Sequence, residues 1–183
     1  MTVTETKLKG CFIIEPKIIR DERGYFMESF NEKSFQNEIG AKVHFVQDNQ
    51  SFSTKGVLRG LHYQTSEHAQ AKLVRVMQGE VLDVAVDIRP ESPTFGQSAS
   101  EILSAENNKQ FFIPRGFAHG FLVLSETAIV FYKCDNAYNA ASEGGIIYND
   151  ETIRINWNFP FSDLVVSQKD QLLPLLEKAK KVW

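Results

Sequence analysis

The sequence is a succession of short runs rich in apolar, β-branched and aromatic residues, with a turn signal about every eight to twelve residues. Runs of this length and spacing predict an all-β sandwich or barrel. The 14 phenylalanines, 5 tyrosines and 2 tryptophans support that prediction, because aromatic side chains favour strands. The expected strands are residues 11–20, 24–30, 43–53, 57–63, 72–76, 81–88, 97–103, 110–113, 120–124, 128–134, 146–148 and 153–157.

Turn and capping residues between these runs predict a hairpin and two helices. Gln78-Gly79 predicts a tight hairpin between the two runs that flank it, with the glycine supplying the turn. Asn31 is suited to cap a short helix that ends before Gly40. The tail from Pro174 to Val182 is also expected to be helical, with the proline in its first turn.

The composition limits the classes of protein to which the chain can belong. The chain has 183 residues, of which 43% are hydrophobic, and this predicts one globular domain over residues 1–183. A formal net charge of -3 without a basic run argues against a nucleic-acid binder, and no apolar run is long enough to span a membrane. Cys11 and Cys134 are too few for a disulfide framework. With no secretory signal, they predict a cytoplasmic location.

Two stretches are so apolar that both faces of the expected strand should be covered. They are Phe111-Phe112-Ile113 and Phe121-Leu122-Val123-Leu124, expected in the core or at a subunit contact. A small barrel with a filled outer face and an open mouth holds one small ligand. The inward polar residues of the central strands are therefore the candidate site.

Two motifs contain most of these polar residues. The first is Gly56 to Gln64, GVLRGLHYQ, followed by Lys72 and Gly79, and the second is Pro114 to Phe121, PRGFAHGF. Together they resemble the signature motifs of the cupin superfamily, which is a jelly-roll barrel. The resemblance implies a cupin-type jelly roll, here with short peripheral helices and a C-terminal helix.

The cupin resemblance also locates the positions at which a metal-binding cupin presents its ligands. In this chain they are His62, Gln64, Lys72 and His119. A lysine ammonium has no lone pair to offer a cation and repels it, and an amide is a poor ligand for a borderline metal. The sequence therefore predicts a site that binds no metal and works without a cofactor.

Over residues from about 10 to 175, the chain resembles the dTDP-4-dehydrorhamnose 3,5-epimerase family more closely still. The matching stretches, in the family's order, are DERGYFME (21–28), QDN (47–49), LRGLHYQ (58–64), AKLVRV (71–76), the second cupin motif, YK (132–133), EGG (143–145), ND (149–150) and SQKD (167–170). The resemblance implies an isomerase that inverts C3 and C5 of dTDP-4-dehydro-6-deoxy-D-glucose to give dTDP-4-dehydro-L-rhamnose. Such an enzyme takes a proton from the carbon next to the C4 ketone and returns one to the opposite face.

Other functions stay open at this point. A related enzyme that inverts only C3 or only C5 of a dTDP-4-keto-deoxysugar would share the same active residues. A metal-dependent cupin and a non-catalytic sugar-binding cupin are the remaining alternatives.

The family resemblance assigns the catalytic roles. His62 is the base, because an imidazole takes and releases protons near neutral pH, and Asp170 is hydrogen-bonded behind it. Tyr132 is the acid on the opposite face of the substrate, and Lys72 lies near the forming enolate oxygen. A structural interpretation of Asp170 competes with this one, because Ser167-x-x-Asp170 is a capping-box-like pattern.

The resemblance implies a second group of residues that bind the substrate: Arg23, Phe26, Glu28, Gln47, Asn49, Arg59, His119, Tyr138, Glu143 and Lys169. The arginines are suited to the pyrophosphate, and Tyr138 to stacking on thymine. The family places the first three residues on an N-terminal strand exchanged within a homodimer. The segment from Asn136 to Ala140 departs from the family, because it lacks a second aromatic residue and a proline. Asp83 is a candidate to orient His62 or Lys72.

Overall fold

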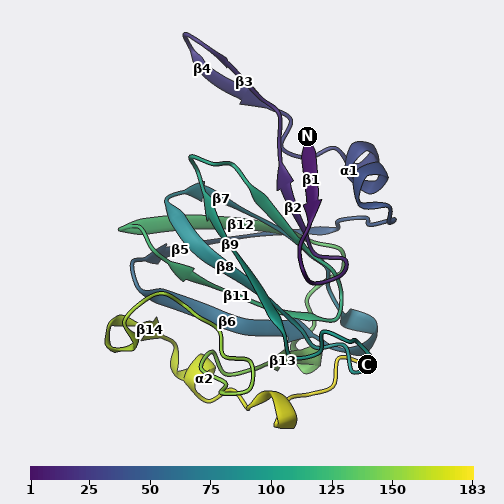
Figure 1. Cartoon of the computed structure of the whole chain (residues 1–183), viewed down its shortest axis with the longest axis vertical. Helices are drawn as coiled ribbons and strands as arrows, with labels where there is room; N and C mark the ends of the chain where they lie inside the picture. The colour runs from purple at the N-terminus through teal and green to yellow at the C-terminus, as the bar shows by residue number, and fades with distance from the viewer.

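The computed structural model describes all 183 residues, and most of its regular structure is strand (Figure 1). The strands are β1 (Thr2–Glu5), β2 (Phe12–Glu15), β3 (Ile18–Asp21), β4 (Gly24–Met27), β5 (Gln47–Thr54), β6 (Val57–Gln64), β7 (Lys72–Gln78), β8 (Glu80–Asp87), β9 (Ser98–Ser104), β10 (Gln110–Ile113), β11 (Phe117–Val123), β12 (Thr127–Cys134), β13 (Glu143–Gly145) and β14 (Val165–Val166). The helices are α1 (Glu32–Ile39) and α2 (Gln168–Gln171), and the 3-10 turns are η1 (Ser66–His68), η2 (Ala140–Ser142), η3 (Phe161–Asp163) and η4 (Leu176–Lys178). The predicted all-β class is confirmed.

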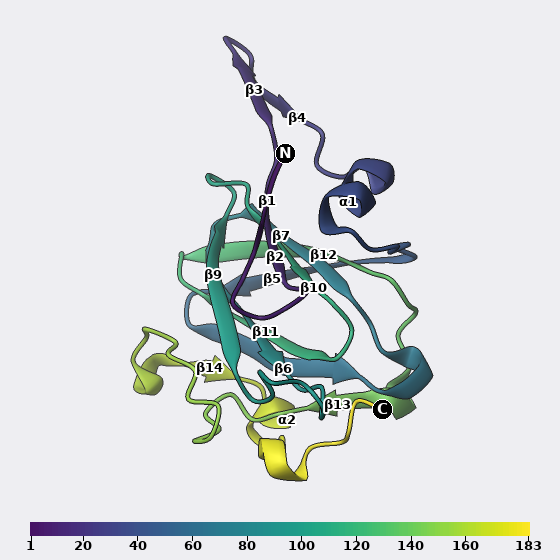
Figure 2. The same cartoon turned by 45° about the vertical axis from the view of Figure 1, so that its right-hand side comes forward.

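Two sheets form the body of the molecule. The first has the order β1-β2-β10-β7-β12-β5, and the second has the order β13-β6-β11-β8-β9, with β14 paired to β6 in parallel. They face each other as the predicted jelly-roll barrel. Strands β3 and β4 pair only with each other, and their hairpin projects away from the body (Figures 1 and 2).

The core lies between the two sheets. Strand alternation turns every second residue inward, so Val74 and Phe111 of the first sheet share one buried cluster with Ala85 and Val123 of the second. A fully buried side chain of valine or phenylalanine size contributes about 1.5–3 kcal/mol. The expected burial of the apolar stretches is confirmed for both Phe111-Phe112-Ile113 and Phe121-Leu122-Val123.

The outer faces of the sheets are covered by chain segments near the two ends of the sequence. Helix α1 packs Phe35 and Ile39 against the outside of the first sheet. Its predicted bounds are confirmed, since Asn31 Oδ1 accepts a hydrogen bond from Ser34 N at 3.1 Å and Gly40 is left-handed, with φ 67°. The C-terminal segment covers the second sheet. No helix is long and apolar enough to cross a membrane.

The hairpin predicted at Gln78-Gly79 is wrong. Strand β7 pairs with β10 and β12, whereas β8 pairs with β9 and β11, so the chain crosses here from one sheet to the other. Gly79 has φ 76°, and a Cβ there would lie 2.1 Å from the carbonyl oxygen of Thr127. The glycine therefore permits a close approach at a corner of the barrel, a role that the local sequence does not distinguish from a hairpin turn.

The helix predicted from Pro174 to Val182 is also wrong, because only the turn η4 is helical there. The tail instead follows the second sheet, where Val182 is buried and its carbonyl accepts a hydrogen bond from Ser66 N at 2.6 Å. The expected strands at 146–148 and 153–157 are loops, although Trp157 is buried under the same sheet. Long-range packing has overridden local helix and strand preferences.

A bulge in β6 sets the direction of the residues in the first motif. His119 of β11 pairs with His62, and Phe121 pairs with Arg59, so two steps along β11 correspond to three along β6. As a result, Arg59 and His62 both face the space between the sheets, although their spacing would otherwise place them on opposite faces. Gly60 lies at the bulge with φ 125°, and a Cβ there would lie 2.6 Å from Gly120 Cα.

Gly60→Ala is expected to lower the free energy of unfolding by more than about 2 kcal/mol, because the new methyl group meets backbone atoms and the backbone conformation is strained. Urea denaturation followed by tryptophan fluorescence measures this change. Gly24→Ala is the matched control, since Gly24 has φ 126° with no atom within 4 Å of the new Cβ. Equal losses in the two variants would show that close packing at the bulge is unimportant.

Candidate active site

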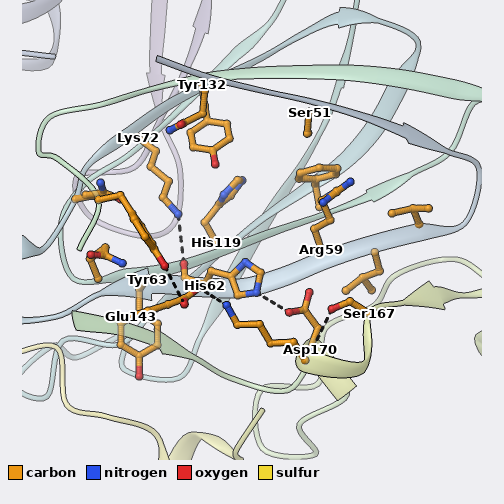
Figure 3. A pocket seen from close by; sticks show the side chains of 18 of the residues that line it. Ser51, Arg59, His62, Tyr63, Lys72, His119, Tyr132, Glu143, Ser167 and Asp170 are labelled. Atoms are coloured by element: carbon orange, nitrogen blue, oxygen red, sulfur yellow. Dashed lines mark hydrogen bonds and ion pairs between the residues drawn. The ribbon is translucent and has the colours of Figure 1, made fainter. Parts of the chain in front are cut away.

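One cavity of about 610 Å³ opens between the two sheets (Figure 3). Its walls come from β5, β6, β7, β11 and β12, and from the C-terminal segment that includes α2. The structure brings together at this cavity the predicted residues His62, Lys72, Tyr132, Asp170, Gln47, Asn49, Arg59, His119, Tyr138, Glu143 and Lys169. Arg23, Phe26 and Glu28 do not line it. A volume of this size suits a small organic ligand.

His62 and Asp170 form a hydrogen-bonded pair on one wall. The distance between His62 Nε2 and Asp170 Oδ1 is 2.8 Å, and the other carboxylate oxygen accepts a hydrogen bond from Gly60 N at 3.1 Å. The single carboxylate therefore holds both the imidazole and the bulge of β6. With Nε2 engaged, Nδ1 is the ring nitrogen left to exchange a proton with a ligand.

The two interpretations of Asp170 turn out to be compatible. Ser167 caps α2, and its Oγ accepts a hydrogen bond from the backbone N of Asp170 at 3.1 Å. The cap thus uses the backbone of Asp170, while its carboxylate points at His62. Burial alone would raise the pKa of Asp170, but the hydrogen bond and charge of His62 hold that pKa below its ordinary value. The carboxylate is therefore ionised at neutral pH, and it accepts the hydrogen bond from His62 Nε2.

Lys72 and Tyr132 lie on the opposite wall, in β7 and β12 of the first sheet (Figure 3). Lys72 Nζ donates a hydrogen bond to the backbone carbonyl of His62 at 3.4 Å and lies 5.9 Å from the centre of the Tyr132 ring. Burial lowers the pKa of Lys72, partly offset by Cys134 and Asp83. A cation held in a partly dry cavity stabilises an anion more strongly than one in water.

Tyr132 points inward from β12, as strand alternation allows. Its hydroxyl makes no hydrogen bond within the chain, and burial raises the pKa of Tyr132. The phenol therefore keeps its proton at neutral pH and is free to donate it to a ligand. The cavity thus has an imidazole on one wall, a phenol on the other and an ammonium group beside the phenol.

A second histidine–aspartate pair lies deeper in the second sheet. His119 Nε2 is 2.9 Å and 3.1 Å from the two carboxylate oxygens of Asp83, which is completely buried. The expectation that Asp83 orients His62 or Lys72 is therefore wrong, because Asp83 faces His119 across the β8–β11 pair. Burial lowers the pKa of His119 despite the nearby carboxylate. The His119 ring lies 6.4 Å from the Tyr132 ring.

The mouth of the cavity is built from polar contacts between distant segments. Glu143 binds Lys169 Nζ at 2.7 Å and the Tyr138 hydroxyl at 3.3 Å. The backbone N of Tyr138 donates to Gln47 Oε1 at 2.9 Å. Burial alone would raise the pKa of Glu143, but Lys169 and Tyr138 hold it below the ordinary value. Tyr138 is half exposed, so its ring is available to a ligand at the mouth.

Strand β5 contributes a row of polar side chains that face the cavity. Gln47 and Asn49 were predicted there, and Ser51 follows them on the same face of the strand. Ser51 was missed from the sequence, because a lone serine in a strand carries no motif. Its hydroxyl is buried and has no hydrogen-bond partner in the chain. Arg59 lies beside this row, with Nε donating to Ser53 Oγ at 3.0 Å.

The residues at the cupin metal positions have other contacts. Gln64 Oε1 accepts a hydrogen bond from the backbone N of Asn139 at 2.9 Å and so holds the loop at the mouth. The ammonium group of Lys72 is held by the backbone carbonyl of His62. No group of three or more His, Cys, Asp or Glu side chains is arranged to hold a metal ion.

Arg23, Phe26 and Glu28 belong to the projecting β3–β4 hairpin and its exit. The side chain of Arg23 is 84% exposed and pairs only with Asp21, and Phe26 is 69% exposed. These residues contact nothing at this chain's own cavity. Large exposed apolar side chains on a projecting hairpin are typical of a surface that binds another protein.

Comparisons with known proteins show which family the chain resembles over nearly its whole length. Residues 5–178 match the model of a family described as dTDP-4-dehydrorhamnose 3,5-epimerase. The enzyme of that name from Salmonella typhimurium is 57% identical over 98% of this chain and 97% of its own length.

Two solved structures are also close. The dTDP-4-dehydrorhamnose 3,5-epimerase of Elizabethkingia anophelis superposes with a TM-score of 0.95 at 54% identity, covering 100% of this chain and 99% of that one. The dTDP-6-deoxy-D-glucose-3,5-epimerase of Legionella pneumophila, solved with dTDP-4-keto-L-rhamnose, superposes with a TM-score of 0.93 at 51% identity, covering 97% and 93%.

Proposed function

The chain belongs to the dTDP-4-dehydrorhamnose 3,5-epimerase family and inverts C3 and C5 of dTDP-4-dehydro-6-deoxy-D-glucose, and we propose that His62, Lys72, Tyr132 and Asp170 carry out this reaction. The observation that carries the assignment is the placement of the His62–Asp170 pair and Tyr132 on opposite walls of one cavity. Epimerisation needs a base on one face of the sugar and an acid on the other.

The first step is proton removal next to the C4 ketone. Nδ1 of His62 takes the proton from C3 or C5, and the electron pair of the broken C–H bond moves to the C4 oxygen to form an enolate. Asp170 fixes the orientation of the imidazole and stabilises the imidazolium that forms. Because the carboxylate is buried and ionised, it favours the charged ring without taking the proton.

Lys72 stabilises the enolate oxygen. Lys72 extends from the wall opposite His62, and its ammonium group reaches across the cavity to donate a hydrogen bond to the His62 carbonyl, which fixes its position. Loss of one donor to a developing oxyanion typically costs about 10²–10³-fold in turnover. The cation therefore supplies the charge that a metal ion would supply in another cupin.

Tyr132 completes the inversion. Its hydroxyl donates a proton to the carbon from the face opposite His62, and the enolate returns to the ketone. The phenolate then regains a proton from solvent, and the His62 imidazolium releases its proton to solvent, so both groups return to their starting states. The free hydroxyl and the raised pKa of Tyr132 fit this role. The same sequence of steps acts on the second carbon after the substrate is repositioned.

The remaining polar residues hold the dTDP group. Arg59 is suited to the pyrophosphate, because a guanidinium binds phosphate oxygens in a bidentate manner. Tyr138 is suited to stacking on thymine at the mouth, with Glu143 and Lys169 beside it. Gln47 and Asn49 complete this group from β5, and His119 completes it from β11.

The chain acts as a homodimer in this proposal, with the β3–β4 hairpin of each copy reaching the cavity of the other. Three observations support it. The hairpin projects from the body, it exposes Ile19, Tyr25 and Phe26, and β1 is the edge strand of the first sheet, with one side unpaired.

We also propose a cytoplasmic location, because both cysteines are free and buried and disulfides are rare in that compartment.

His62→Ala is expected to lower turnover by at least about 10²-fold while leaving dTDP affinity within about twofold, because it removes the base and few ligand contacts. Deuterium entry at C3 and C5 of dTDP-4-dehydro-6-deoxy-D-glucose in deuterated water, followed by NMR after chelator treatment, measures the chemistry. Tyr132→Phe should still exchange deuterium but lose inversion, since only the acid is missing.

His44→Ala is the matched control, because His44 is exposed and does not line the cavity. Full activity of His62→Ala would show that another group is the base. Deuterium at only one carbon would indicate single epimerisation, and exchange that depends on added metal would indicate a metal-dependent cupin.

The rate is expected to fall on the alkaline side when Lys72 loses its proton. Burial lowers the pKa of Lys72 and raises that of Tyr132, so both shifts favour loss of the lysine proton before the tyrosine proton as pH rises. Lys72→Arg should move the alkaline fall in kcat to higher pH, because a guanidinium stays charged there. Tyr132→Phe, followed by deuterium exchange because it does not invert the substrate, should show the alkaline fall at the wild-type position. An alkaline fall that stays in place in Lys72→Arg would contradict the enolate role.

Subunit mixing tests the proposed hairpin exchange. His62→Ala homodimers and homodimers with Arg23→Ala and Phe26→Ala are both expected to be impaired. When they are dissociated and reassembled together, about a quarter of all sites should pair an intact His62 with an intact hairpin and regain activity. If each hairpin served its own cavity, mixing would restore nothing. Mixing each variant with itself is the control.

A further inference from the structure

The loop from Asp135 to Ser142 carries Tyr138 to the cavity mouth, and it includes the segment from Asn136 to Ala140 that lacks the second aromatic residue and the proline expected from the family. The structure shows what holds this loop in place. Asn136 Nδ2 donates to the backbone carbonyl of Glu67 at 2.8 Å, and Gln70 Nε2 donates to the backbone carbonyl of Asn136 at 2.8 Å. The segment from η1 to Gln70 is thus the support on which the loop rests.

His68 of η1 contacts the far end of the same loop with both ring nitrogens. Nε2 is 3.2 Å from Asn139 Nδ2, and Nδ1 is 3.0 Å from Ser142 Oγ. Asn139 is adjacent to Tyr138, so this contact lies one residue from the side chain assigned to the nucleotide base. The turn itself is anchored to the C-terminal segment through Ser66 N and the Val182 carbonyl.

The geometry determines the protonation of His68. Asn139 Oδ1 already accepts hydrogen bonds from the backbone N of Ala141 at 2.9 Å and of Ser142 at 3.2 Å, so the amide group cannot turn over without losing both. Asn139 Nδ2 must therefore donate to His68, and His68 Nε2 must accept. The ring is then neutral, with its proton on Nδ1 donated to Ser142 Oγ.

We propose that neutral His68 is a positioning residue for nucleotide binding, which holds the Tyr138 loop at the cavity mouth and releases it when the ring is protonated. A proton on Nε2 would face the amino group of Asn139, so the acceptor is lost and two donors oppose each other. The inference rests on the proposed binding of the dTDP group beside Tyr138.

Among the contacts that hold this loop, the His68 contact is the one made by an imidazole, a side chain whose hydrogen-bonding pattern changes when it gains a proton. Gln64, Gln70 and Asn136 are amides and keep their hydrogen bonds at all pH values at which the protein folds. The contact between Thr65 N and the Ser142 carbonyl is also independent of pH. Protonation should therefore loosen the Tyr138 end of the loop without unfolding it.

The charged groups around His68 are few. Glu67, on the same turn, has Oε1 3.9 Å from His68 Nδ1. From the C-terminal segment, Lys180 Nζ donates hydrogen bonds to the Ala141 and Glu143 carbonyls. Asp135 of the loop is neutralised by Arg115 at 2.8 Å.

The test compares dTDP binding by wild type and His68→Gln, measured by calorimetry from about pH 8 to about pH 5.5. Glutamine presents an acceptor oxygen where Nε2 lies and does not titrate. The ratio of the wild-type Kd to the His68→Gln Kd should be near one at the higher pH and rise about three- to tenfold at the lower, the effect of losing one or two neutral hydrogen bonds. Ionisation of the ligand's phosphates cancels in this ratio.

Two further variants make the result specific. His68→Ala should bind dTDP weakly at both pH values, with a raised KM and an unchanged kcat, because loop position affects binding and the catalytic groups lie elsewhere. In a Tyr138→Ala background the pH-dependent ratio should stay flat, because the side chain that the loop presents is missing.

A flat ratio in the wild-type background would overturn the role of His68, as would His68→Gln binding as weakly as His68→Ala at the higher pH. Failure of the wild type to bind dTDP at any pH would instead overturn the proposed nucleotide site. The two failures are therefore distinguishable.

Discussion

The catalytic geometry depends on the hydrogen bonds of one buried carboxylate. Asp170 accepts from the amide at the β6 bulge and from His62, so one side chain joins the C-terminal segment to the second sheet. A buried charge is costly unless its hydrogen-bonding capacity is used, and here it is used by two groups that both need a fixed position. The bulge in turn allows Arg59 and His62 to share the cavity.

The two sheets divide the chemistry between them. The second sheet presents His62 and His119, each hydrogen-bonded to its own aspartate, and the first presents Lys72 and Tyr132. A ligand held between the sheets meets an imidazole on one side and a phenol and an ammonium group on the other. Opposed walls are what inversion at a carbon requires, and a jelly roll supplies them through its architecture.

Local patterns in the sequence predicted local features well. Strand alternation correctly allowed Tyr132 to point inward, and the family motifs identified half of the residues that line the cavity, including all of its histidines, lysines and carboxylates. The failures all involve contacts between distant segments. Gln78-Gly79 reads as a hairpin because the local conformation at a barrel corner is similar. The tail at 174–182 has helical propensity but packs along a sheet, and Asp83 gave no sign that its partner would be His119.

Gln64 has a consequence for how such an enzyme changes over evolution. Its side chain occupies a position where a metal-binding relative would present a ligand, yet here it anchors the mouth loop through Asn139 N. A mutation that restored a ligand at this position would release the loop, while the ammonium of Lys72 would still repel the ion. Two coordinated substitutions, one at Gln64 with a new support for the loop and one at Lys72, would therefore be needed before these positions could hold a metal ion.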